Sequence, residues 1–230
     1  MTNSAMNQFL FIVLPYLVMF IFFLGTIWRY RKAPFTYSSL SSQFLENQSH
    51  FWALVPFHYG IVTVLVGHTF AFLLPQQLLA WNSRPLRLYV LEVTALVAGL
   101  LTLVGILGAI LRRIRVSKIR EVTNTFDWIV LTLLLFQIVL GVSVAIFHPW
   151  GSSWFAAAIS PYLWSLVRFS PDLGYIALLP PLVKAHIVLA YGIIGIAPFT
   201  RLVHILVVPN PYLWRRPQVV RWYRAPKAVA

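Results

Sequence analysis

Histidine is the side chain of this sequence best suited to bind a transition metal, because the 230 residues include six histidines and no cysteine. Four of the six fall within long apolar stretches, where burying a polar ring costs free energy unless it forms hydrogen bonds or binds a ligand. These four are His58, His68, His186 and His204. They are the candidate functional residues. The other two, His50 and His148, lie beside polar segments and are expected at the surface.

The spacing of the four histidines predicts two pairs between two helices. The ten-residue step from His58 to His68 leaves these rings about 80° apart in helical projection. The eighteen-residue step to His204 from His186 returns to the same face of a helix. Because the two helices run in opposite directions across the membrane, His68 is expected to meet His186. In the other half of the bilayer, His58 is expected to meet His204.

One imidazole from each of two facing helices can hold a haem iron from both sides within a bundle. Two pairs therefore predict two haems, and the absence of cysteine limits them to the non-covalent b type. Nearby glycines would leave room for a flat macrocycle, or equally for helix contact; they are Gly60, Gly67, Gly192 and Gly195.

Other uses of the histidines stay open. They could form hydrogen bonds to neighbouring helices without metal, or bind zinc or copper, although two ligands at each level are too few for a closed zinc site. The haem arrangement also has a geometric difficulty. The helical rise separates the first two histidines by about 15 Å and the last two by about 27 Å. Pro198 is expected to kink the last helix and reduce this mismatch.

The composition predicts the elements that carry these residues. With 60% of residues hydrophobic and 10% charged, the chain is typical of an integral membrane protein. Five stretches reach the length of about 20 apolar residues that crosses a bilayer, so we expect an all-α bundle; they cover residues 8–28, 51–74, 88–111, 126–147 and 182–208. Because the start lacks a cleavable signal, the first is expected to remain. Residues 1–208 would form one domain, and 209–230 a basic cytoplasmic tail on a partner subunit.

The net charge of +13 comes from 18 basic and 5 acidic residues. On a soluble chain it would suggest nucleic-acid binding, but fourteen of the basic residues follow the first, third and fifth spans. The positive-inside rule explains this distribution, excludes a nucleic-acid partner, and predicts an outer amino terminus and a cytoplasmic carboxyl terminus.

Several charged residues and loops have narrower expectations. Arg201, Arg112 and Arg113 could pair with haem propionates or with lipid headgroups, and Asp127 is expected to stabilise the amino terminus of the fourth helix. The outer connection 148–181 is rich in proline and tryptophan and suits a re-entrant or interfacial segment above a site. The polar inner segment 33–50 is expected against the membrane surface or a partner.

Several stretches resemble the gamma subunit of membrane-bound respiratory nitrate reductase, the cytochrome b of that complex. They include residues 57–60, 66–68, 186–189 and 198–204, together with 41–43, 137–141, 208–209 and 212–213. The resemblance implies a subunit of the bacterial or archaeal cytoplasmic membrane that oxidises menaquinol or ubiquinol. It would pass electrons inward to an iron-sulfur (beta) subunit and a molybdenum (alpha) subunit, which reduces nitrate.

The resemblance also implies roles for particular residues. His68 and His186 would hold the outer, distal haem iron. His58 and His204 would hold the inner, proximal one. The family's quinol site includes a lysine at the start of the third span, and the best match here is Arg87, with Arg84 as the competing candidate. Arginine can donate to a quinone carbonyl but stays protonated, so it cannot shuttle a proton as lysine can.

Two other functions fit the same residues. The chain could be a di-haem cytochrome b of another redox complex, such as a sulfite-reducing or heterodisulfide-reductase-like one. It could also be a haem-free transporter with a histidine relay. A transporter of that kind would be colourless, whereas both cytochromes would show b-type absorption bands.

Overall fold

The structure is a computed structural model that describes residues 2–36 and 48–206. These residues form helices and no strands, which confirms the all-α expectation. Five helices are long and apolar enough to cross a membrane, as predicted, and they cover Ala5–Lys32, Phe51–Leu73, Pro85–Arg115, Thr125–Phe147 and Pro181–Phe199. Residues 37–47 and 207–230 lie outside the described part, and with them most of the inner segment and the basic tail.

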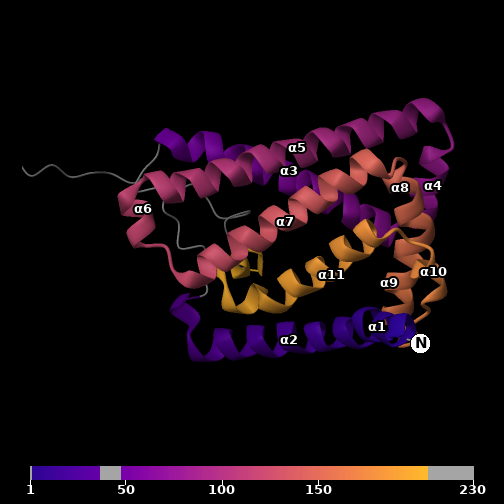
Figure 1. The fold of residues 1–230 in the computed structure, drawn as a ribbon, viewed down its shortest axis with the longest axis horizontal. Coiled ribbons are helices and arrows are strands. Elements are labelled where there is room, and N and C mark those ends of the chain that lie inside the picture. The colour runs from indigo at the N-terminus through magenta and orange to yellow at the C-terminus, as the bar shows by residue number, and fades with distance from the viewer. Residues whose placement is uncertain (1, 37–47, 207–230) are drawn as a thin grey trace, which may run out of the picture.

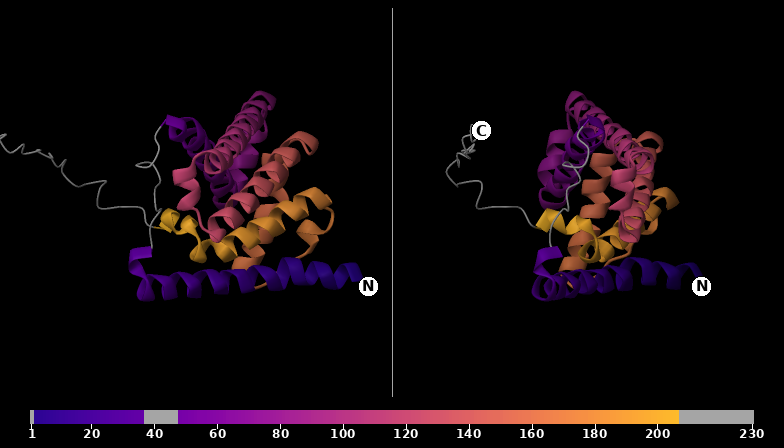
Figure 2. Two further views of the ribbon diagram at one scale, coloured as in Figure 1. Left: turned by 60° about the vertical axis from the view of Figure 1, so that its left-hand side comes forward. Right: turned by 90° about the vertical axis from the view of Figure 1, so that its left-hand side faces the viewer.

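The spans form a curved row in the order α3, α5, α7, α11 and α2 (Figures 1 and 2). Each packs against its neighbours in that row: α3 (Gln48–Leu73) against α5 (Pro85–Arg115), α5 against α7 (Thr125–Phe147), and α7 against α11 (Pro181–Ile196). The last neighbour, α2 (Leu14–Lys32), packs against α11. The row curves so that α3 and α2 stand at its two ends.

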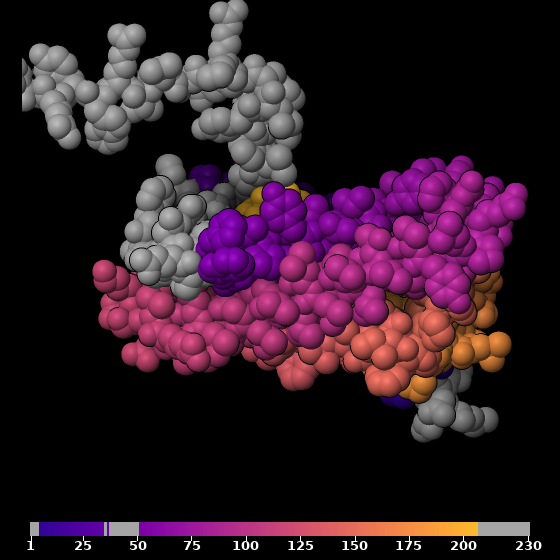
Figure 3. Space-filling view, turned by 90° about the horizontal axis from the view of Figure 1, so that it is seen from above, coloured from indigo at the N-terminus to yellow at the C-terminus, as the bar shows by residue number. Residues whose placement is uncertain are grey.

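Close contact between α3 and α5 depends on glycine. A Cβ atom on Gly105 of α5 would lie 2.4 Å from the backbone nitrogen of Phe57, and one on Gly60 of α3 would lie 2.6 Å from the carbonyl oxygen of Ala98. Small residues allow such backbone approach in membrane helices. The two helices therefore form one continuous surface (Figure 3).

The first span contains a π-helical turn, Phe9–Val13, between α1 (Thr2–Gln8) and α2. Pro15 has no N–H to offer the carbonyl of Phe11, four residues earlier. The hydroxyl of Tyr162 donates to that carbonyl instead, at 2.7 Å. Burial, with Tyr191 beside it, raises the pKa of the Tyr162 hydroxyl above its ordinary value, so it stays protonated as a donor.

Tyr162 belongs to the outer connection, which folds into short helices. These are α8 (Gly151–Trp154), a π turn η3 (Phe155–Ile159), α9 (Ser160–Val167) and α10 (Gly174–Ala177). They gather with α4 (Pro75–Asn82) at one end of the bundle, which we call the far end (Figure 1). Glu92 of α5 holds α8 at this end. Its carboxylate accepts hydrogen bonds from the backbone N–H of Ser152 at 2.9 Å and from the Ser152 hydroxyl at 2.6 Å.

The opposite end carries α6 (Ser117–Glu121) and the last turns of α2 and α5 (Figure 1). We call it the basic end, after the cations that gather on its elements: Arg29, Arg31, Lys32, Arg112, Arg113, Arg115, Lys118, Arg120 and Arg201. Arg84, Arg87, Arg168 and Lys184 lie on elements of the far end. The structure thus separates the two groups of basic residues as the span order predicted.

The last apolar stretch, predicted over 182–208 with a kink at Pro198, does break near that proline, and its α-helical part is shorter than predicted. α11 ends at Ile196, a 3₁₀ turn η4 follows over Ala197–Phe199, and Thr200 is extended. A second 3₁₀ helix, η5 (Arg201–Leu206), then leaves the axis of α11 (Figure 2). Pro198 lacks the N–H that would continue the α-helical hydrogen bonds. The expectation that His186 and His204 share one face of a straight helix therefore does not apply.

Candidate functional site: two histidine pairs

The structure brings His58 and His204 together near the basic end. Their ring centres are 6.3 Å apart, with an interplanar angle of 65°. The Nδ1 atom of His58 bonds the Leu54 carbonyl at 2.7 Å, and that of His204 bonds the Arg201 carbonyl at 2.7 Å. Since a carbonyl oxygen only accepts, each Nδ1 carries a proton, and Nε2 is the ring nitrogen left to bind a ligand.

His204 lies on η5, which two arginines hold in place. Nη1 of Arg29 donates to the carbonyls of Pro198 and Thr200 at 2.7 and 2.8 Å. Breaks in a helix leave such carbonyls without partners, so α2 stabilises the turn that carries η5 away from α11. Because residues 186–204 do not form one continuous helix, the separation of about 27 Å that a straight helix would give His186 and His204 does not apply.

The second arginine is Arg201, on η5 itself. Its Nε and Nη2 atoms donate to the two carboxylate oxygens of Asp127, the latter at 2.7 Å. Asp127 also forms a capping box with Asn124 at the start of α7, which confirms its predicted place at that helix terminus. A haem propionate partner for Arg201 stays a prediction, and two of the nitrogens it would use already bind Asp127.

His68 and His186, the other two predicted partners, lie nearer the far end. His186 lies within electrostatic range of His68. Nδ1 of His68 bonds the Val64 carbonyl at 2.9 Å, which leaves its Nε2 bare, and the ring lies 5.2 Å from that of Phe155. Phe155 comes from the outer connection, so that segment lies over this pair.

A side chain of α7 contacts His186, which is half-buried. Nε2 of Gln137 lies 3.2 Å from Nε2 of His186. Gly141, one turn further along α7, makes room for the imidazole, because a Cβ atom there would lie 3.0 Å from Cε1 of His186. The ring is therefore held against α7, and its own helix contributes no hydrogen bond to it within the described residues.

The glycines divide between packing and open space. Gly60 packs against α5, which agrees with the helix-contact alternative, and a position beside a cofactor stays a prediction. Gly67 and Gly192 have no described atom within 4 Å of a built Cβ, and Gly195 packs on Val18 at 3.5 Å. Open space beside Gly67 adjoins His68, whose ring is exposed, as is that of His58.

The chemistry of the donor set favours a metal that brings its own ligands. Across residues 2–36 and 48–206, no three histidine, aspartate or glutamate side chains gather closely enough to hold a metal ion. Each histidine pair offers two imidazole nitrogens, whereas a closed zinc site needs four ligands. Two opposed nitrogens suit an iron whose equatorial positions are already filled by a porphyrin.

Both predicted quinol-site arginines lie at the far end. The guanidinium of Arg87 stacks over the Trp81 ring, 4.9 Å from its centre. Arg84 immediately precedes α5 and is exposed. Arg112, at the basic end, is buried, and its neighbour Arg113 donates to the Thr123 hydroxyl at 2.9 Å. The structure does not test the predicted roles of these arginines.

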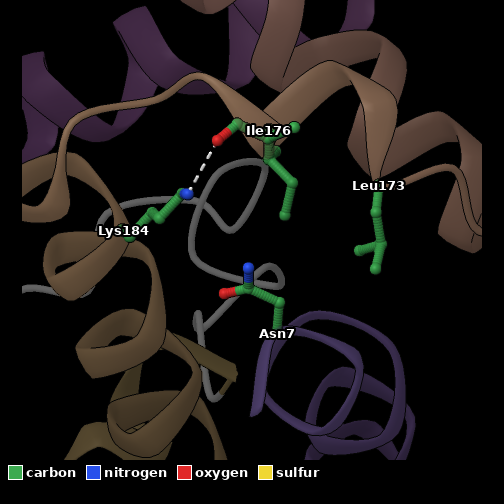
Figure 4. Close-up of a pocket in the computed structure, with 5 residues that line it drawn as sticks. Asn7, Leu173, Ile176 and Lys184 are labelled. Carbon is green, nitrogen blue, oxygen red and sulfur yellow. Dashed lines mark hydrogen bonds between the residues drawn. The ribbon is translucent and has the colours of Figure 1, made fainter. Parts of the chain in front are cut away.

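A cavity of about 230 Å³ lies at the far end, and none of the four histidines is among its lining residues. It is lined by Asn7 of α1, by Lys184 of α11, and by Leu173, Ile176 and Ala177 around α10 (Figure 4). Nζ of Lys184 donates to the Ala177 carbonyl at 3.0 Å. This contact ties the start of α11 to the outer connection.

Sequence reasoning did not assign a role at the site to Arg29 or Gln137. Gln137 offered a signal, because an amide within a strongly apolar span needs a polar partner as much as a histidine does. Arg29 offered none, since it follows the first span like any residue that obeys the positive-inside rule. Its partners exist only because the fifth span breaks at Pro198.

Five apolar spans, with histidines from different spans brought near one another, define a multi-pass helical membrane protein. The sequence places the chain within a known class of such proteins. It matches the nitrate reductase gamma subunit family over residues 7–223, and the chain belongs to that family.

Two relatives, from Escherichia coli and Bacillus subtilis, agree with this chain in length as well as sequence. The chain is 34% identical to the respiratory nitrate reductase 2 gamma chain of Escherichia coli strain K12, over 94% of this chain and 97% of that one. It is 30% identical to the nitrate reductase gamma chain of Bacillus subtilis strain 168, over 94% and 98%. A longer Mycobacterium tuberculosis protein, the nitrate reductase-like protein NarX, is 28% identical over 93% of this chain and 34% of its own length.

Proposed function

We propose that this chain is the quinol-oxidising cytochrome b subunit of a respiratory nitrate reductase, with two b-type haems held by the two histidine pairs. The separation of His58 and His204 carries the proposal. With bonds of about 2 Å between a transition metal and an imidazole nitrogen, two imidazoles that share one ion from opposite sides have ring centres about 6 Å apart. The 6.3 Å observed here agrees with that value.

The chain's own residues prepare the ligands. In His58, His68 and His204 the Nδ1 proton is bound to a backbone carbonyl, which fixes the tautomer that leaves Nε2 as a ligand. Bound haem would supply one-electron transfer. The protein's part is to hold the two rings of each pair facing one another and to set their electron donation.

The two ends of the bundle would divide the work. Quinol would be oxidised at the far end, beside His68 and His186, and its oxidation releases two protons and two electrons. Arg87 would donate a hydrogen bond to the quinol oxygen. Because an arginine side chain stays protonated, it cannot accept the proton that the quinol releases. The electrons would leave at the basic end, near His58 and His204, toward an iron-sulfur subunit and a molybdenum subunit that reduces nitrate.

A difference spectrum tests the haem assignment directly. Membranes that contain the full complex should show b-type bands when reduced, with two haems for each copy of this chain. His186→Ala should lose one haem and keep the other. The absence of b-type bands in the unaltered protein, or two intact haems in His186→Ala, would contradict the proposal. The first of these results would favour a haem-free transporter.

A further inference from the structure

His186 is held differently from the other three histidines. Those three bond a carbonyl of their own helix or turn through Nδ1 and keep Nε2 bare. In His186 the contact is reversed, because Nε2 is the atom that meets Gln137, at 3.2 Å. The atom that should bind iron is therefore occupied by a side chain from α7.

This contact leaves a donor and an acceptor unmatched on the same two side chains. Nε2 of Gln137 can only donate, so Nε2 of His186 accepts, and the ring proton is on Nδ1. Within the described part of the chain, Nδ1 of His186 and Oε1 of Gln137 are both buried and have no hydrogen-bond partner. A buried hydrogen-bonding group without a partner destabilises the fold. A flip that exchanges the amide oxygen and nitrogen of Gln137, together with a rotation of the His186 ring, would pair them.

The same rotation would free Nε2 of His186. The ring would then match the other three, with its Nδ1 proton bound and its Nε2 bare. Gly141 allows this adjustment, since the imidazole already lies against it without an intervening side chain. No other described residue offers the ring a hydrogen bond, so the adjustment depends on Gln137.

We propose that Gln137 is the positioning residue of His186, accepting its Nδ1 proton through Oε1 when Nε2 binds iron. This inference rests on the proposed function, in which His186 is a haem ligand. A hydrogen bond accepted from the far nitrogen of a ligating imidazole fixes its orientation and raises its basicity. Stronger electron donation favours the oxidised iron. Gln137 should therefore lower the reduction potential of the haem at the far end.

Two variants separate the effect of the hydrogen bond from packing. Gln137→Leu has similar bulk and no acceptor, and Gln137→Glu keeps an acceptor of the same shape. Redox titration of the b-type bands in the intact complex should give a raised potential for the far-end haem in Gln137→Leu. In Gln137→Glu its potential should equal the original or fall below it. The basic-end haem, remote from Gln137, should keep its potential in both and serves as the internal control.

Each outcome decides the inference. A far-end haem lost from Gln137→Leu but retained in Gln137→Glu, with the basic-end haem present in both, would also support it. Equal far-end potentials in all three proteins would overturn it. Loss of both haems from Gln137→Leu would show a general packing role and overturn it too. An unaltered protein without b-type bands would instead refute the proposed function, so the two failures are distinguishable.

Discussion

At the scale of single residues, the site depends on where each imidazole proton lies. A backbone carbonyl four residues earlier binds Nδ1 of His58 and of His68, and this contact is a consequence of helical geometry. His204 reaches the Arg201 carbonyl, three residues earlier, because η5 is a tighter helix. Different backbone conformations thus give these three histidines the same tautomer.

His204→Ala tests the independence of the two pairs. The basic-end haem should be lost, because the variant lacks one of the two histidines that would hold it, whereas the far-end haem should remain. Added quinol should still reduce the remaining haem, while nitrate reduction by the complex falls to background. Haem content by pyridine haemochromogen and stopped-flow reduction by quinol would measure both effects. Loss of quinol reduction in this variant would contradict the assignment of quinol oxidation to the far end.

Arg87→Ala tests the quinol site. Removal of the guanidinium should raise KM for a soluble quinol analogue by about ten- to a hundredfold, since a hydrogen bond to a charged group contributes about 1.5–3 kcal/mol. Arg168→Ala is the matched control, because Arg168 is also an exposed far-end arginine that stacks on a tryptophan, 5.9 Å above Trp164. Unchanged kinetics in Arg87→Ala, or an equal loss in Arg168→Ala, would count against Arg87.

The four histidines could be found from sequence because a polar ring in an apolar span stands out. Their hydrogen-bond partners could not, with Gln137 as the example. Its role depends on the rotation of α7 relative to α11, which follows from packing at Gly141 and has no signature in either helix alone. Gly60 shows the same limit, because a glycine that makes room for a helix and one that makes room for a cofactor look alike in sequence.

At the scale of elements, the spans were predictable and the break in the last one was only partly so. Hydropathy indicates where a chain crosses the membrane but does not distinguish a straight helix from one that stops at Ile196 and resumes as a 3₁₀ turn. Pro198 signalled a bend. The direction of that bend depends on Arg29 and Asp127, which come from two other helices.

Asp127→Asn tests this anchoring of η5. The pair with Arg201 is largely buried, at 3% exposure for the Asp127 side chain and 19% for Arg201. Removing one partner of a buried pair costs about 3 kcal/mol or more. We expect a lower melting temperature and loss of the basic-end haem, with the far-end haem retained.

Asn124→Ala is the control for Asp127→Asn. It removes the capping side chain that Asp127 shares but leaves the ion pair. It should cost about 1 kcal/mol, the usual effect of a lost helix cap, and should keep both haems. Equal haem loss in the two variants would show that the start of α7, rather than its link to η5, holds His204.

At the scale of the whole molecule, the separation of charge between the two ends predicts the orientation in the membrane. Among the described residues, the elements of the basic end carry nine of the thirteen cations, and those of the far end carry four. The positive-inside rule places the basic end in the cytoplasm. The pair His58 and His204 would then face the cytoplasmic partner subunits, and the proposed quinol chemistry would release protons outside.

The chain itself makes this orientation easy to test, because it has no cysteine to replace before labelling. Ser83 at the far end and Ser117 at the basic end are both exposed and lie at junctions between helices. In intact cells a membrane-impermeant maleimide should label Ser83→Cys and not Ser117→Cys, whereas permeabilised cells should label both. The reverse pattern would place quinol oxidation on the cytoplasmic side. Proton release would then no longer contribute to a transmembrane gradient, even if both histidine pairs hold haem as proposed.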